Sequence, residues 1–525
     1  MVNPFILSFV AETGFRKWIV TFTVVSGVLL ELIDTTVVNV ALPNIMGNLG
    51  ATLEDVGWVV TSYTLANVII LPISGWLGDR FGRKKYFLIS IISFTLISLL
   101  CGNSKSLTEL ICFRLAQGMA GGGLLSTGQA ILLDTWPRKE IGMGMAIFGV
   151  GVILGPTVGP TLGGFIVDHF SWQWIFYINL PVGLIASFLV STFIRESDQH
   201  GKGQPVDWWG ILLLAITIGS LQVVLEKGES VGWFQTPYIV ILSLSAVFGG
   251  LIFFWRELLI PYPVVNFSIF RYRSFTLGAI TIFLFGLILY CSLFAFPLFC
   301  QNILGLTAQQ TGELLIPSSV VTMLFMPVAG ALTKSGFPTQ VLAASGILFF
   351  YVSFHLLAGV TISTGAEYFF LPMVFLGIGR ALLFVPLTTL ALQDLTEKET
   401  GQGTGLNNMM RQLGGTMGIA IFTTVLNIMT IRYRNILITH INPYNPAFTH
   451  KQGMLSHSFI MKGYTAVQAN HLSMMIINHE IYQQVQLLAY NNIYRLTGIA
   501  MLFCIPLFLL QKFSKKPVLS VNGMH

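Results

Sequence analysis

The stretch Gly75-Trp-Leu-Gly-Asp-Arg-Phe-Gly-Arg-Lys-Lys85 lies between two long apolar runs, and it decides how the rest of the chain folds. Its acidic and basic side chains are costly to place in hydrocarbon, so the loop must lie at a membrane surface. Short loops rich in Lys and Arg stay on the cytoplasmic side. The loop therefore predicts two membrane-spanning helices that meet in the cytoplasm.

The composition of the 525-residue chain also indicates a membrane protein, because 54% of the residues are hydrophobic and 10% are charged. Soluble domains contain about 25% charged residues. The net charge of +6 is explained by basic inner loops, so no nucleic-acid partner is expected. The five cysteines lie in or beside apolar runs without paired spacing, which indicates neither a disulfide framework nor a zinc site.

A spanning helix needs about 20 mostly apolar residues. This criterion predicts an all-α integral membrane protein with fourteen spans, at 18–42, 56–77, 86–103, 108–132, 142–167, 172–194, 208–226, 236–256, 275–300, 311–333, 338–359, 368–392, 404–430 and 490–511. With the N-terminus inside, eighteen Lys and Arg residues fall in inner loops and six in outer loops. The bias favours an even number of spans and two cytoplasmic termini. Twelve spans would also satisfy it, but the two apolar runs at 208–256 favour fourteen.

An internal repeat suggests how the spans are grouped. Pro72-Ile-Ser-Gly-Trp-Leu77 recurs as Pro327-Val-Ala-Gly-Ala-Leu332. Such repeats are common in transporters, which place their site between the halves. The expected organisation is a six-helix unit at 1–200, two additional helices at 201–260, and a second six-helix unit at 261–525 that includes an outer loop at 432–489.

The outer loop is the one sizeable polar segment, and helices are expected in it near 447–462 and 466–489. It contains His440, His450, His457, His471 and His479. Without tight ligand spacing these histidines are expected to be solvated, and no metal site is predicted.

The chain contains no Walker-type phosphate loop and no room for a nucleotide-binding domain. An ion gradient is the remaining common energy source. No nucleophile–base set or cofactor loop is evident either, so the chain is not expected to be an enzyme or to hold a cofactor.

Charged residues within the spans are usually functional. Glu31 and Asp34 lie three residues apart and project from one face of the first helix. Two close carboxylates in a low dielectric should not both stay ionised, which suits a proton carrier. The alternative is that they pair with Arg114 or Arg380 and only hold helices together. Arg114 stays charged, so it can tune a nearby carboxylate without titrating, or it can be purely structural.

Two further features indicate moving parts. In the span 142–167, glycines form a ridge along one face while two prolines break the hydrogen-bond ladder; these residues are Gly151, Gly155, Pro156, Gly159, Pro160 and Gly163. Asp134 is expected to pair with Arg83 across the cytoplasmic surface, as a weak latch that opens in each cycle.

These blocks together resemble the fourteen-span drug:proton antiporter branch of the major facilitator superfamily, the EmrB/QacA type. The likeness includes Leu32-Ile-Asp-Thr-Thr-Val-Val-Asn-Val-Ala-Leu-Pro43, the loop 75–84, Arg114 to Gly118, the Gly-Pro motif at 149–164, Trp172 to Pro181, and Asn407-x3-Arg411-x2-Gly-Gly415.

The resemblance implies roles for individual residues. Asp34 would handle the proton and Arg114 would couple it, with Glu31 as a further candidate that lies outside the family pattern. Asp79 would cap the span 404–430 at its cytoplasmic end and, with Arg83 and Asp134, stabilise the outward-open state; the gating set also includes Gly75, Arg80 and Gly82. Candidates for the substrate pathway are Asn39, Gln117, Asn179, Arg380 and Arg411.

The expected function is proton-coupled export of hydrophobic drugs or toxic compounds across a bacterial inner membrane by alternating access. The resemblance also implies a periplasmic adaptor and an outer-membrane channel as partners. Two alternatives stay open: a dedicated exporter of one metabolite, such as a siderophore or fatty acid, and a sensor or scaffold that no longer transports.

Overall fold

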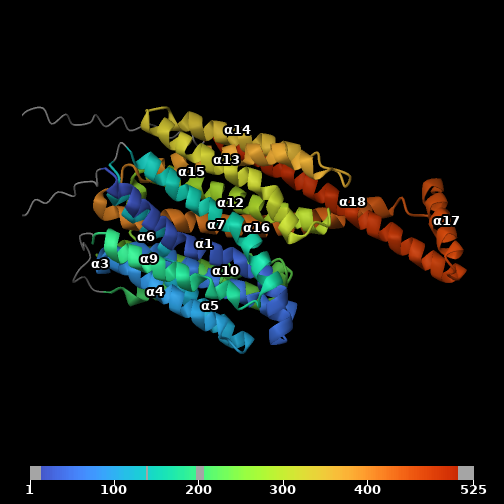
Figure 1. The fold of residues 1–525 in the computed structure, drawn as a ribbon, viewed down its shortest axis with the longest axis horizontal. Helices are drawn as coiled ribbons and strands as arrows, with labels where there is room; N and C mark the ends of the chain where they lie inside the picture. Colours follow the sequence, from blue (N-terminus) through green and yellow to red (C-terminus); the bar gives the residue numbers. More distant parts are fainter. Residues whose placement is uncertain (1–13, 138–139, 197–205, 507–525) are drawn as a thin grey trace, which may run out of the picture.

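The computed structural model describes residues 14–137, 140–196 and 206–506, which form a bundle of long helices without a strand (Figure 1). The helices of these residues are α1 (Arg16–Leu49), α2 (Leu53–Val56), α3 (Trp58–Phe81), α4 (Arg83–Gly102), α5 (Leu107–Gly121), α6 (Leu124–Thr135), α7 (Ile141–His169), α8 (Trp174–Tyr177), α9 (Asn179–Phe193), α10 (Trp208–Lys227), η1 (Trp233–Gln235), α11 (Pro237–Leu259), η2 (Phe267–Arg271), α12 (Arg273–Asn302), α13 (Ala308–Lys334), α14 (Thr339–Leu357), η3 (Ala366–Phe369), α15 (Phe370–Leu392), α16 (Glu397–Ile438), α17 (Pro446–Met461) and α18 (Ala466–Leu502).

The all-α membrane fold is confirmed, because twelve segments of the described chain are long and apolar enough to cross a membrane. The predicted span 108–132 is the pair α5 and α6, which the glycines at 122 and 123 separate. The predicted span 490–511 begins within α18, and its residues from 507 onward lie outside the described part of the chain. Fourteen spans are consistent with this arrangement.

Two helices extend furthest beyond their predicted bounds. Helix α16 covers residues 397–438 rather than 404–430, and α18 begins at residue 466 rather than 490. The reason is that no Gly or Pro interrupts the chain between Gly418 and the end of α16, or between Ala466 and Gly498. The predicted loop 432–489 is therefore mostly helix, and the two helices expected in it are present as α17 and the outer part of α18. In Figure 1 this extension projects from the bundle.

The repeated motif packs in the same way in both copies. A Cβ added to Gly75 of α3 would lie 2.3 Å from the backbone oxygen of Gly401 in α16. A Cβ added to Gly330 of α13 would lie 2.7 Å from the backbone oxygen of Gly142 in α7. Each glycine thus lets a helix of one half contact the backbone of the other half. These contacts lie at the end of the bundle that contains residues 79–85, called here the basic-loop end.

The additional helices pack beside this core. Helix α10 packs against α11 and also contacts both α3 and α16. The Glu226 carboxylate accepts a hydrogen bond of 2.7 Å from Thr61 of α3. Asn427 of α16 donates a hydrogen bond of 3.2 Å to Glu229 just after α10. One end of α10 is therefore tied to both halves of the bundle.

Candidate functional site

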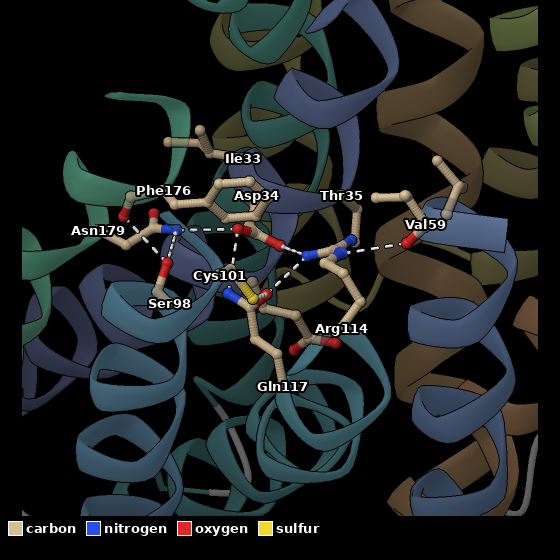
Figure 2. A network of polar contacts seen from close by, with 12 residues as sticks. Ile33, Asp34, Thr35, Val59, Ser98, Cys101, Arg114, Gln117, Phe176 and Asn179 are labelled. Atoms are coloured by element: carbon tan, nitrogen blue, oxygen red, sulfur yellow. Dashed lines mark hydrogen bonds and ion pairs between the residues drawn. The ribbon is translucent and has the colours of Figure 1, made fainter. Parts of the chain in front are cut away.

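Asp34 lies at the centre of a buried polar network formed by α1, α5 and α9 (Figure 2). The residue as a whole is 1% exposed. Arg114 donates to Oδ2 at 2.5 Å, while Oδ1 accepts from Asn179 at 2.9 Å and from Gln117 at 3.2 Å. Both oxygens of the carboxylate are thus occupied by hydrogen-bond donors from α5 and α9.

The Arg114 guanidinium is fixed on several sides. Its Nε donates to the backbone oxygen of Val59, and its Nη1 also donates to Gln117 at 2.7 Å. It lies 4.1 Å from the centre of the Tyr63 ring, a cation–π contact. Helix α5 approaches α3 this closely because a Cβ on Gly118 would lie 2.3 Å from the backbone oxygen of Tyr63. The glycine one turn after Arg114 therefore places its charge against Asp34.

Ser98 of α4 extends the network, and the sequence reasoning did not identify it. Its hydroxyl donates to the backbone oxygen of Phe176 and accepts from Asn179 at 3.0 Å. Gln117 and Asn179, expected in the substrate pathway, both contact Asp34 instead in this conformation. Only tertiary structure brings Ser98 here, because a serine within an apolar span gives no distinctive sequence signal.

Glu31 occupies a separate place from Asp34 although both lie on α1. Asn67 of α3 donates to its carboxylate at 2.7 Å. The arginine whose charge acts on Glu31 is Arg411 of α16, whereas Arg380 was one of the two partners considered in the alternative interpretation of the sequence. Arg411 itself contacts Asn408 at 3.4 Å and the Tyr290 hydroxyl at 3.5 Å. The structure therefore places Glu31 at the junction of the two halves, opposite a cation of the second half.

The basic loop holds the two halves together at its end of the bundle. Arg83 forms an ion pair with Asp134, as the sequence predicted, and a second one with Asp79 at 3.2 Å. A Cβ on Gly401, in the first turns of α16, would lie 2.9 Å from the Asp79 carboxylate. Asp79 thus lies against the start of α16, where a helix N-terminus favours negative charge.

The other two residues of the predicted gating set shape the loop itself. Gly82 has φ +92°, a conformation that other residues rarely adopt, and it ends α3 before α4 begins. The Arg80 guanidinium lies 5.3 Å from the centre of the Trp76 ring.

A second link between the halves was not predicted. Glu140, just before α7, forms ion pairs with Lys17 of α1 and with Lys334 of α13, the latter at 2.8 Å. Hydrogen bonds from the two lysines lower the pKa of Glu140 to about 2. These residues lie in different loops and helix ends, so sequence spacing gave no sign that they would meet.

The glycine ridge of α7 faces α1, and the two helices pack closely along it. Added Cβ atoms at Gly151, Gly155, Gly159 and Gly163 would contact Val25, Leu32, Thr36 and Val37 in turn. Asp34 lies between Leu32 and Thr36 in the sequence. The ridge, interrupted by Pro156 and Pro160 within the helix, therefore supports the helix that holds Asp34.

Several candidates lie apart from this network. Asn39 is exposed and donates to the backbone oxygen of Thr35. Arg380 is buried within the second half and does not contact Glu31, Asp34 or Arg114. The described residues contain no cluster of three or more His, Cys, Asp or Glu side chains arranged to hold a metal ion, and the five histidines of residues 432–489 are exposed.

The comparisons with known proteins agree with this architecture. The family model for the Major Facilitator Superfamily matches residues 24–419. The chain is 31% identical to the Escherichia coli (strain K12) "Multidrug export protein EmrB", over 89% of this chain and 92% of that protein. It is 30% identical to the Neisseria gonorrhoeae "Fatty acid resistance protein FarB", over 96% of this chain and 97% of that protein.

Solved structures show the same fold. The human organic anion transporter MFSD10 superimposes with a TM-score of 0.57 at 14% identity, over 93% of this chain and 99% of that one. A double-tryptophan mutant of XylE gives a TM-score of 0.56 at 14% identity, over 95% of this chain and 97% of that one. At this identity the likeness concerns the fold alone.

Proposed function

Because this chain belongs to the major facilitator superfamily, we propose that it is a proton-coupled antiporter that exports hydrophobic drugs or toxic compounds. The observation that carries the proposal is the buried network around Asp34, a carboxylate inside the membrane whose neighbours are Arg114 and two amides. The multidrug export protein to which the chain is similar supports drugs as the substrate class.

In the proposed cycle, Asp34 takes up and releases the proton. The ionised carboxylate and Arg114 together are neutral, so adding a proton leaves one net positive charge in the network. The lost attraction between Asp34 and the guanidinium would favour a rearrangement of α1 relative to α5. Moving one charge across the membrane supplies about 2.3 kcal/mol per 100 mV.

We further propose that the conformation described here faces outward. The contacts of Gly75 with α16 and of Glu140 with Lys334 close the basic-loop end, which the positive-inside rule places in the cytoplasm. Both termini would then be cytoplasmic in a bacterial inner membrane. The helical extension formed by α17 and the outer parts of α16 and α18 would face the periplasm and contact an adaptor that leads to an outer-membrane channel.

The proposal is tested with the purified protein in liposomes. An imposed pH gradient that is acidic on the periplasmic face should drive export, and a gradient that is acidic on the cytoplasmic face should slow it. Collapse of the gradient by a proton ionophore should abolish accumulation of a fluorescent hydrophobic dye. Gradient-independent dye movement would contradict proton coupling.

The Glu140 link should tune the conformational equilibrium without sensing pH. We expect Glu140→Gln to raise the fraction of molecules whose basic-loop end is open by no more than about fivefold. The reason is that exposed ion pairs contribute little free energy to the closed conformation. Since the pKa of Glu140 falls from 4.5 to about 2, the link is present above pH 4.5 and weakens only as pH falls toward 2. Distances between spin labels across this end, measured from pH 5 to 9, should therefore show a constant effect.

A matched control for this variant is Glu480→Gln, which removes the exposed ion pair with Lys451 on the helical extension. It should leave the same distances unchanged. An effect of Glu140→Gln that disappears between pH 5 and 9 would contradict the assignment.

The ridge of α7 should be sensitive to a single methyl group. A Cβ on Gly155 would lie 2.5 Å from the Cβ of Leu32, which cannot rotate away, so Gly155→Ala must displace α1 beside Asp34. We expect at least a tenfold loss of export rate at unchanged amounts of folded protein. Gly164→Ala is the matched control, because an added Cβ there meets nothing within 4 Å. Equal rates for the two variants would show that the ridge is not needed.

A further inference from the structure

Arg380 of α15 is a buried cation without a strong partner. Its side chain is 1% exposed and lies against α12 and α13. Its two hydrogen bonds are long, at 3.4 Å to the Ser292 hydroxyl and 3.5 Å to the Ser318 hydroxyl. Its buried Nε has no hydrogen-bond partner. The guanidinium therefore lacks the acid that Arg114 has in Asp34.

Among the residues that the structure describes, the surrounding half of the protein does not supply a buried counter-charge. The buried charged residues of the described chain from α12 to α18 are both arginines, Arg380 and Arg411. An uncompensated charge in a low-dielectric interior is strongly unfavourable. A cation kept at such a position is therefore suited to an anion that comes from outside the protein.

The two serines are placed to help bind that anion. The Ser292 hydroxyl donates to the backbone oxygen of Leu289 at 2.7 Å, and the Ser318 hydroxyl donates to that of Leu315 at 2.9 Å. Both hydroxyls can therefore only accept from Arg380 in this conformation. A rotation about each side chain would turn the two hydroxyls into donors to a bound oxyanion.

The neighbourhood of Arg380 is apolar and aromatic. Phe384 lies one turn later on the same face of α15, and its ring packs edge-on against Phe285 of α12 with ring centres 6.4 Å apart. Phe296 of α12, one turn after Ser292, is also buried. A charged group at Arg380 would thus be attached to a hydrocarbon or aromatic body that these rings accommodate.

From this arrangement we infer that Arg380, Ser292 and Ser318 bind the carboxylate of an amphipathic organic acid that the protein exports. The inference rests on the proposed export function and specifies its substrate class. Because Arg380 is enclosed here, binding requires the opposite conformation, in which the basic-loop end opens.

The test is equilibrium binding of radiolabelled dodecanoate to the purified full-length protein in chloride-free gluconate buffer, with uncharged dodecanamide as the matched ligand. We expect Arg380→Gln to weaken dodecanoate binding at least tenfold and to change dodecanamide binding less than twofold. Arg380→Lys should retain part of the preference, because a charge remains without the planar donor fork. Ser292→Ala with Ser318→Ala should weaken dodecanoate binding more than dodecanamide binding.

Arg432→Gln, which neutralises an exposed arginine of the α16 extension, is the control and should bind both ligands as the unaltered protein does. Circular dichroism and gel filtration establish that each variant is folded. Unchanged dodecanoate binding by folded Arg380→Gln would overturn the inference.

The bound anion could instead be chloride from solution, which shares the chemistry of the site. Labelled chloride that binds in an Arg380-dependent way, while dodecanoate and dodecanamide bind equally, would also overturn the assignment to a substrate carboxylate. Failure of the proposed export function can be distinguished from failure of this inference. In that case dodecanoate would bind in an Arg380-dependent way, but no compound would be transported by a gradient.

Discussion

Asp34→Asn should abolish export driven by a pH gradient, with a loss of at least a hundredfold in the initial rate. The amide cannot take up or release a proton in the relevant range, and in either orientation its NH2 group faces a donor that now donates to a carboxylate oxygen. Efflux from liposomes under an imposed gradient measures this directly. Equilibrium binding of the fluorescent dye should persist, since the variant removes the coupling group and leaves the apolar side chains of the helices unchanged.

Asp55→Asn is the matched control, because it neutralises an exposed acid of α2 that lies outside the buried network. It should transport within twofold of the unaltered protein. Normal uphill export by Asp34→Asn would refute the role of Asp34.

The ion pair between Asp34 and Arg114 should also contribute to the stability of the folded protein. Removing one partner of a buried ion pair costs about 3–5 kcal/mol, because the other charge remains buried and unpaired. Asp34→Asn and Arg114→Gln should therefore each lower the thermal unfolding midpoint, while the double variant should be more stable than either single one. Additive losses would show that the two groups do not act as a pair.

Gly75→Ala is expected to have the second-largest effect, because it prevents the basic-loop end from closing. The added Cβ would lie 2.3 Å from the Gly401 oxygen, 2.5 Å from the Gly401 carbonyl carbon and 2.6 Å from the Gln402 Cα. All three are backbone atoms, so α3 and α16 must separate. We expect at least a tenfold loss of transport and a longer spin-label distance between the loop 79–85 and the first turn of α16.

Gly78→Ala provides the matched control in the same turn of α3. Its Cβ would meet the Arg83 Cγ at 3.4 Å, an ordinary contact, so transport and distance should change little. If Gly75→Ala behaved like Gly78→Ala, the closure of this end through backbone contact would be wrong.

The sequence predicted the features that depend on local composition. Apolar runs of sufficient length gave the spans, and the charges of residues 79–85 gave the surface loop, because hydrocarbon excludes both water and charge. The glycines of α7 indicated a close helix neighbour, because a spacing of four residues places them on one face of the helix. The Arg83–Asp134 pair was also predicted, from complementary charges at adjoining helix ends.

Other features depended on which helices meet. Glu31 and Asp34 share a helix face in the sequence, yet one contacts Asn67 and the other contacts Arg114, because α3, α5 and α9 approach α1 at different heights. Of the pairings left open by the sequence, the one between Asp34 and Arg114 is present, while Glu31 contacts Asn67. Likewise Glu140 joins Lys17 and Lys334 from distant parts of the chain.

By itself, then, the sequence determined that this chain crosses a membrane as helices and buries an acid in the first of them, because hydropathy and charge act on each segment separately. Only the tertiary structure decided which donors surround Asp34 and that Arg380, among the residues the structure describes, lies beside serines and not beside an acid. Both depend on contacts between helices far apart in the sequence, and such contacts are set by how whole helices pack.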